Sequence, residues 1–191
     1  MSSTAKLITA ATFYPITLSD GKEHLRITGT DEDDLIELYI KAATLYAENY
    51  TGAVYSTQTW DYYMDVFPTV IQLPYLPVAS VTYVKYYDSD NTLTTLVEDT
   101  DYRVDLITGK IEYITSWPAA YDRSSAVVVR FVCGYASIDD IPEDIKHAVK
   151  LMVGNYYENR QEIMTSTGAL SMAKLEFGAN NILDRHIIFN P

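Results

Sequence analysis

Apolar residues recur at helical spacing in two segments of the chain and at strand spacing between them. In the first segment, residues 31–51, they form two neighbouring stripes on one predicted helix. The stripes are Leu35, Tyr39, Ala42, Ala43, Tyr46 and Tyr50, and Ile36, Ile40, Ala43 and Ala47. Because apolar positions cover so much of its circumference, we expect this helix to be buried on more than one side, and one of those sides suits a neighbouring subunit.

The second helical segment covers residues 142–161. Pro142 stands in its first turn beside Glu143 and Asp144, which favours a helix start there. The face that we expect to be buried comprises Ile145, Ala148, Val149, Met152, Val153 and Tyr156. A short helix is also predicted before the first long one, because Thr17 can cap it with Asp20 three residues on.

Between residues 53 and 133 the apolar period changes to two. This segment predicts six or seven antiparallel strands, with tight turns at residues 88–91 and 108–109, in a small sheet, sandwich or open barrel. The predicted fold class is therefore α+β, a helical platform with an inserted antiparallel β module and a C-terminal tail. The predicted boundaries are 1–52 and 134–162 for the helical core, 53–133 for the β module and 163–191 for the tail.

The 191 residues, 48% of them hydrophobic, suffice for one folded core, or for one core with a smaller satellite. No apolar run reaches the roughly 18–20 residues that a membrane span needs, and the N-terminus lacks the pattern of a secretory signal. The single cysteine, Cys133, excludes an internal disulfide and lies in an apolar strand, where we expect a buried thiol. These features fit a protein made in a reducing cytosol, without a membrane partner.

The net charge of −12 is spread along the chain, and no cluster of Lys or Arg occurs. Tight binding to a phosphate backbone draws on clustered cations, so direct recognition of nucleic acid is not expected.

The seventeen tyrosines are the other unusual feature of the sequence. Tyrosine favours strands, but it is also enriched at protein interfaces. The second explanation suits the tyrosines on the predicted helices, which are Tyr39, Tyr46, Tyr50, Tyr156 and Tyr157.

Catalytic and metal-binding motifs are absent from the sequence. The three histidines, His24, His147 and His186, lie in different predicted elements without a partner at metal-ligand spacing. The acids at 31–34 fit a helix start and are not followed by a calcium-loop pattern. We therefore expect no metal, no cofactor and no enzyme activity. Two groups of carboxylates near strand ends keep a hydrolase open as an alternative: Asp61 with Asp65, and Glu98 with Asp99 and Asp101.

Several short motifs follow one another in a specific order between roughly residues 16 and 162. They are Leu18–Ile27, Asp31–Ile36, Ala47–Gly52, Gln58–Trp60, Ile71–Pro74, Asp101–Val104, Gly134-Tyr135, Ile141–Lys146 and Tyr156–Arg160. Their order resembles the head–tail connector, or adaptor, family of tailed bacteriophages, in its longer members that contain β-structure.

The resemblance implies a structural virion protein that forms a ring, of twelve copies in that family, beneath the portal. Such a ring extends the DNA channel and receives the head-closure or tail-completion protein, and DNA passes through it without specific binding. The expected location is the head–tail interface of the virion, after assembly in the host cytoplasm. The acidic charge either repels DNA phosphates in such a channel or aids solubility.

Three groups of residues receive expected roles on this basis. Candidate contacts between subunits are Tyr39, Tyr46, Tyr156, Tyr157 and Arg160. Candidate acids that line the channel are Asp33, Asp34, Glu37 and Glu48. The C-terminal tail either packs on its own domain or enters a partner groove, and the resemblance favours docking on the portal. The docking residues are then Phe177, Ile182, Leu183, Arg185, Ile187, Ile188 and Phe189, with Arg185 pairing to a portal acid.

A chain truncated after Glu162 is expected to keep its melting behaviour and to lose attachment to portal. The remaining alternative to a connector is a carbohydrate- or protein-binding β module, in which Trp60, Tyr62 and Tyr63 form a stacking platform. A monomer that binds glycans would favour this module, whereas a defined ring would favour the connector.

Overall fold

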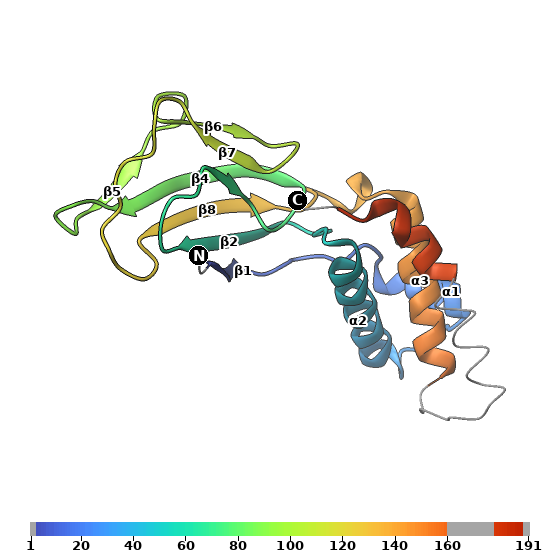
Figure 1. Cartoon of the computed structure of the whole chain (residues 1–191). Helices are drawn as coiled ribbons and strands as arrows, with labels where there is room; N and C mark the ends of the chain where they lie inside the picture. The colour runs from blue at the N-terminus through green and yellow to red at the C-terminus, as the bar shows by residue number, and fades with distance from the viewer. Residues whose placement is uncertain (1–2, 160–177, 189–191) are drawn as a thin grey trace, which may run out of the picture. The chain divides into compact units, whose positions relative to one another are not determined.

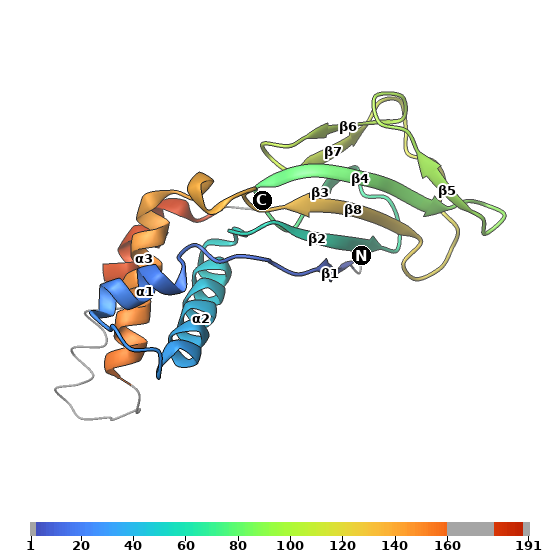
Figure 2. The ribbon, with the colours of Figure 1, turned by 180° about the vertical axis from the view of Figure 1, so that it is seen from behind.

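The computed structural model describes residues 3–159 and 178–188 of the chain. They form two compact units, each drawn in Figure 1 and, from behind, in Figure 2. The β unit holds residues 3–11 and 57–135, and the helical unit holds residues 12–56, 136–159 and 178–188. The mixture of helices and antiparallel sheets confirms the predicted α+β class.

The β unit contains two antiparallel sheets. The larger one has the strand order β1-β2-β8-β4-β5, and the smaller one has the order β3-β7-β6. The strands of the larger sheet are β1 (Ser3–Thr9), β2 (Gln58–Met64), β8 (Val127–Cys133), β4 (Val78–Tyr87) and β5 (Leu93–Leu96). The strands of the smaller sheet are β3 (Val70–Gln72), β7 (Lys110–Tyr113) and β6 (Tyr102–Asp105). The two predicted turns are confirmed as the β4–β5 and β6–β7 connections.

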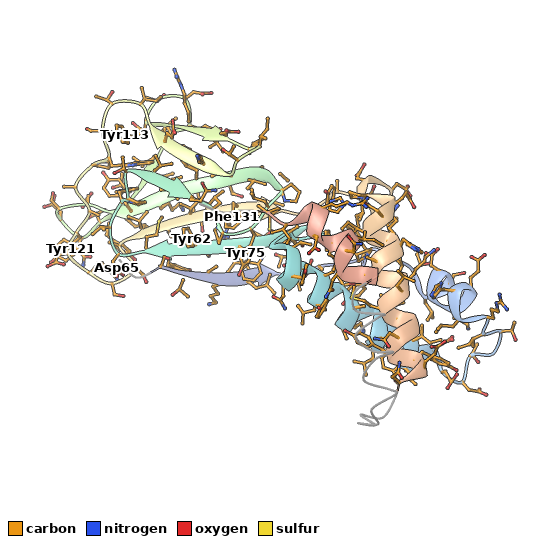
Figure 3. All side chains as sticks on the ribbon, turned by 45° about the vertical axis from the view of Figure 1, so that its right-hand side comes forward. Tyr62, Asp65, Tyr75, Tyr113, Tyr121 and Phe131 are labelled. Carbon is orange, nitrogen blue, oxygen red and sulfur yellow. The ribbon has the colours of Figure 1, made fainter. Side chains whose placement is uncertain are left out.

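The core of the β unit lies between these two sheets, which both views show one above the other (Figures 1 and 2). Alternate residues of β8 are fully buried, and Cys133 is among them, as predicted. Phe131 of β8 stands opposite Trp60 of β2, and Figure 3 labels Phe131 beside Tyr62 of the same neighbouring strand. From the smaller sheet, Ile71 and Ile111 are fully buried. One face of the larger sheet is therefore covered, and the other face remains for solvent or partners.

The helical unit consists of α1 (Leu18–Leu25), α2 (Asp33–Thr51) and α3 (Glu143–Glu158), with single 3₁₀ turns η1 (Ile138–Asp140) and η2 (Asp184–His186). Residues 178–183 add a helical segment before η2. The core of the helical unit is formed by buried residues of α2 and α3. They are Ile36, Ile40, Ala43 and Ala47 of α2, and Ile145, Ala148, Val149, Met152 and Val153 of α3. Tyr156, which we expected on the same face, is half-buried.

The ends of the helices follow the local chemistry of the sequence, with one correction. Thr17 and Asp20 form the predicted capping box of α1, and Gly52 ends α2 in the left-handed conformation with φ of 72°. The start of α2 is later than predicted, because the helix begins at Asp33 and Glu32 stands at the N-cap without a side-chain hydrogen bond. Asp33 instead forms an ion pair with Lys22 of α1, with 2.6 Å between Oδ1 and Nζ.

The N-terminal segment corrects the predicted domain boundaries. We assigned residues 1–52 to the helical core, but residues 3–9 form β1 and pair with β2 across the sheet edge, from Ser3 opposite Met64 to Thr9 opposite Thr59. All but one residue of β1 are exposed, so no alternation of apolar and polar side chains marks it as a strand. The backbone hydrogen bonds to β2 hold this segment in place, and they leave no trace in the side-chain pattern.

Candidate functional site

The helical unit presents an exposed apolar face on α2. Leu38 is 57% exposed and Leu45 is 59% exposed, and the exposed Ala42 lies between them. Positions 38, 42 and 45 lie on one side of a helix, because three or four residues make one turn. Solvent-exposed leucines at this spacing are typical of a surface that packs against another protein.

The sequence-based reasoning missed Leu38 and Leu45. It assigned the apolar positions of α2 to two stripes, and the structure shows that only the stripe with Ile36 and Ile40 faces the core. The missing signal was present in the sequence, since two leucines seven residues apart with an alanine between them form a third stripe. The prediction that α2 has more apolar surface than its own fold covers is consistent with this exposed face.

The tyrosines predicted to contact other subunits have partners within their own unit. The rings of Tyr39 and Tyr156 are 6.0 Å apart, and the rings of Tyr46 and Tyr50 stack at the same distance. Tyr46 donates a hydrogen bond to the side-chain oxygen of Asn180, and Tyr157 donates one to the carboxylate of Glu32. Tyr46 remains 37% exposed, beside Leu45. These tyrosine side chains therefore stabilise the helical unit itself. Arg160, the fifth predicted contact residue, lies outside the described residues.

The four acids predicted to line a channel have different environments. Asp34 and Glu37 are exposed, and Glu37 lies 3.7 Å from the ammonium group of Lys41. Asp33 is paired with Lys22, as described above. Glu48 is half-buried and accepts a hydrogen bond of 3.0 Å from the backbone N–H of Tyr55. Burial raises the pKa of Glu48, and the hydrogen bond from Tyr55 opposes this rise. The assignment of Glu48 to an open acidic surface is therefore corrected.

The described part of the C-terminal tail packs on the helical unit. Leu183 is fully buried and Ala179 is 1% exposed, so these two side chains, four residues apart, belong to the core. His186 and Asp144 are joined by a hydrogen bond of 2.6 Å, and Tyr50 donates one of the same length to Asp184. The role of Leu183 as an exposed docking anchor is therefore corrected, because burying its apolar surface within the chain is already favourable.

The other described docking residues are less deeply buried than Leu183. Ile182, Ile187 and Ile188 are half-buried, and Arg185 is exposed. Phe177 and Phe189 lie outside the described residues. The packing of residues 178–188 on their own unit was the other of the two options that the sequence left open.

The proposed stacking platform of the β unit is not formed. Trp60 and Tyr62 lie on the covered face of the sheet, whereas Tyr63 points to the opposite face, because successive residues of a strand alternate. The ring of Trp60 packs against Tyr75, with 4.4 Å between the ring centres. Three side chains on two faces of a sheet cannot hold one sugar ring or peptide between them.

Three of the five carboxylates considered for catalysis are held in structural contacts, whereas Glu98 and Asp99 are exposed. Asp61 is 3% exposed and receives two hydrogen bonds from Arg130, of 2.7 and 2.8 Å, across the β2–β8 pair. Asp65 accepts a hydrogen bond from the backbone N–H of Ser125, and Figure 3 labels it at one end of the β unit. Asp101 accepts one from the backbone N–H of Val97. These arrangements are typical of structural ion pairs and turns.

The described residues contain no group of three or more His, Cys, Asp or Glu side chains that is arranged to hold a metal ion. Across residues 3–159 and 178–188, no helix is long and apolar enough to cross a membrane. The most distinctive surface of the helical unit therefore remains the apolar face of α2, which suits an assembly contact.

The comparisons with known proteins agree with an assembly role. A family model described as "Head completion protein" matches residues 15–177. No curated protein matches the chain.

Solved structures share the fold over nearly the whole length. A chain from the "Neck of empty GTA particle computed with C6 symmetry" has 22% identity and a TM-score of 0.79, with 98% of this chain and 97% of that chain covered. A chain from the "Virion of native gene transfer agent (GTA) particle" has 22% identity and a TM-score of 0.77, with coverage of 98% and 96%. A chain from the "Neck of native GTA particle computed with C12 symmetry" has 20% identity and a TM-score of 0.75, with coverage of 98% and 97%.

Proposed function

Because this chain belongs to the head completion protein family, we propose that it is a structural protein of the virion neck, a connector between head and tail. The family match across residues 15–177 is the observation that carries this proposal. The shared fold with chains from the neck of a gene transfer agent supports it. Asp61, Asp65 and Asp101, three of the carboxylates considered for catalysis, are engaged in an ion pair or in hydrogen bonds to the backbone, which suits a structural protein.

The protein acts as a ring of identical copies. Rings need a heterologous contact, in which one surface of a protomer meets a different surface of the next. The face of α2 with Leu38, Ala42 and Leu45 supplies one of the two surfaces, since its exposed leucines would be removed from water there. The neck structures similar in fold were computed with sixfold and twelvefold symmetry, and twelve copies is the number we propose.

The ring lies beneath the portal, extends the DNA channel and receives the head-closure or tail-completion protein. Asp34 and Glu37, the two exposed members of the predicted acidic set, are suited to a wall that DNA slides past, because like charges repel the phosphates. Arg185, which is exposed, is available to pair with a portal acid. Assembly takes place in the host cytoplasm before the particle is complete.

The test is to mix the purified protein with the portal ring of its own virus and to image the complex by cryo-electron microscopy. The expected result is a ring of several copies on one end of the portal, coaxial with its channel. Leu38→Lys with Leu45→Lys should fold but fail to complete the ring, because lysine does not gain from burial as leucine does. Wild-type protein that never joins portal in multiple copies would show that the proposed function is wrong.

A further inference from the structure

The uncovered face of the larger sheet gathers most of the cations of the β unit. This unit has six basic and ten acidic residues, so its own net charge is negative. The register nevertheless places Lys6 opposite Asp61, Asp61 opposite Arg130, and Arg130 opposite Tyr83 in one row across four strands. Lys85 lies two residues beyond Tyr83 on the same face, because side chains alternate along a strand.

Tyrosine rings hold these cations in place. The ammonium group of Lys85 lies 4.4 Å from the ring centre of Tyr83, and the guanidinium of Arg130 lies 5.1 Å from the same ring. Arg123 lies 3.9 Å from the ring of Tyr87, which follows Lys85 on this face. Such cation–π contacts fix the charged groups before a ligand arrives and lower the entropy lost on binding.

One acid, Asp61, lies in the row of cations on this face. Asp61 is buried and pairs with Arg130 through two hydrogen bonds, so this pair has no net charge and the uncompensated cations of the face are Lys6, Lys85 and Arg123. Lys6 and Arg123 are exposed, and Lys85 is half-buried. The cationic face, defined by Lys6, Lys85, Arg123 and Arg130, is therefore suited to a ligand with several carboxylates or phosphates.

The same unit carries a compact acidic loop of complementary charge between β5 and β6. Glu98, Asp99 and Asp101 are all exposed there, beside Val97, which is 57% exposed. Two hydrogen bonds shape the loop: the carboxylate of Asp101 accepts one from the backbone N–H of Val97, and the backbone N–H of Asp99 donates one to the carbonyl of Tyr102. A preformed loop with three acids and one apolar side chain is a good ligand for a cationic face.

We propose that the cationic face of one copy binds the acidic loop of residues 97–101 of a second copy, as a contact between the β units of neighbours in the ring. This proposal rests on the proposed function, because the contact would repeat between successive copies around the neck ring. The contact is heterologous, because the face and the loop are different surfaces of the chain, and it can therefore close a ring. Val97 would pack beside Val128, the half-buried residue that pairs with Lys85.

A loop of the same chain fits this face better than a nucleic acid does. A long polyanion gains affinity by contacting many cations in a row, and here acids flank the cations at the rim. Asp122 precedes Arg123, and Asp88 and Asp90 lie in the turn that follows Tyr87. The Tyr83 and Tyr87 rings are also already engaged by cations, which leaves their faces less open for base stacking.

Charge reversal tests the contact. The first variant, Lys6→Glu with Lys85→Glu, makes the face acidic, and the second, Glu98→Lys with Asp99→Asn, removes the net negative charge of the loop. Asn suits position 99, where φ is 63°. Each variant alone should associate with itself roughly tenfold more weakly than the wild type, because each breaks the same contact. An equimolar mixture should recover association, since each altered surface then meets a compatible one on the other variant.

Sedimentation and native mass spectrometry give the readout, alone and on the portal ring, and melting curves check that each variant folds. The matched control is Arg103→Glu with Lys110→Glu, which removes two cations of the smaller sheet and should leave association unchanged. Wild-type-like association of the first variant, or a mixture that recovers nothing, would overturn the proposal. Loss of binding to a DNA duplex in the first variant, without recovery in the mixture, would overturn it in favour of a nucleic-acid site.

The same experiment separates this proposal from the proposed function. If the wild-type protein joins portal as a ring and all variants behave like it, the neck role is supported and the contact between cationic face and acidic loop is rejected. If the wild-type protein associates with itself and the mixture of variants recovers association, but the protein never joins portal, the contact is supported and the neck role is rejected. A wild type that does not associate with itself under any of these conditions rejects the contact.

Discussion

The backbone N–H of Ile188 donates a hydrogen bond of 2.7 Å to the carbonyl oxygen of Thr51, the last residue of α2. The final carbonyl groups of a helix have no partner within the helix, and this bond satisfies one of them. The contact joins two positions that are far apart in the sequence, and Tyr50 and Asp184 form a second bond beside it. The described tail therefore closes the helical unit at the C-terminal end of α2.

The first prediction concerns the stability of this closure. Leu183→Ala should lower the free energy of unfolding by about 2–5 kcal/mol, because it removes a fully buried side chain and leaves a cavity. Chemical denaturation followed by circular dichroism measures the change. The control is Arg185→Ala, an exposed neighbour, which should change the stability by less than about 0.5 kcal/mol.

Truncation extends the same argument. A chain that ends at Glu162 lacks Ala179 and Leu183 and should melt at a lower temperature, contrary to the expectation from sequence alone. An unchanged melting curve for the truncated chain would mean that the tail contributes nothing to the core.

The second prediction concerns Glu48 and pH. Burial raises the pKa of its carboxyl group above the ordinary value, so the folded protein holds this proton more firmly than the unfolded chain does. The contribution of Glu48 to stability is therefore fully present below pH about 4 and is lost as the pH rises through the raised pKa. Glu48→Gln keeps an acceptor for the N–H of Tyr55 and cannot ionise. The variant should match the wild type in acid and become more stable than it towards pH 7.

Unfolding measurements of both proteins between pH 4 and pH 7 test this. Glu37→Gln is the matched control, because Glu37 is exposed and its substitution should give no comparable trend. Equal stability of wild type and Glu48→Gln at every pH would contradict the assigned burial of the carboxyl group.

The sequence predicted the elements whose side chains alternate, and it failed where backbone or surface contacts decide the structure. The cap at Thr17 and the turns at residues 88–91 and 108–109 follow from local patterns that the structure confirms. The strand β1 lacked a pattern because it is an exposed edge strand held by backbone bonds. Likewise, composition could not show that cations scattered through the sequence, such as Lys6 and Arg130, meet on one sheet face, since strand register brings them together.

Candidate site residues were harder to predict for a related reason. Tyrosines on a helix can contact another subunit or another helix of the same chain, and only the fold distinguishes the two. Tyr39 and Tyr156 come from different helices and meet within one unit. Leu38 and Leu45 are instead more than half exposed among the described residues, and they are therefore the better candidates for a contact with another subunit.

The third prediction concerns these leucines. Leu38→Lys with Leu45→Lys should leave the free energy of unfolding within about 0.5 kcal/mol of the wild type, because both side chains are more than half exposed. Ring formation should be lost, since the exposed apolar face is the proposed contact. The control is Ile107→Lys, at a β-hairpin tip where the side chain is 91% exposed, which should not alter the ring. Intact rings of the double variant would exclude α2 as the contact.

The last prediction concerns the ion pair of Asp61 and Arg130, whose two members are buried to different extents. The Asp61 side chain is 5% exposed and that of Arg130 is 32% exposed. If Asp61→Asn removes the acid, water can still hydrate Arg130, and the cost should be about 1.5–3 kcal/mol, the value of a hydrogen bond to a charged group. If Arg130→Met removes the base, a nearly buried carboxylate loses its partner, and the cost should approach about 3–5 kcal/mol. The double variant Asp61→Asn with Arg130→Met should be more stable than Arg130→Met alone, because no unpaired charge remains in the sheet. Urea denaturation of the four proteins at pH 7 measures these differences, and a double variant less stable than Arg130→Met would show that packing, and not the unpaired charge, sets the cost.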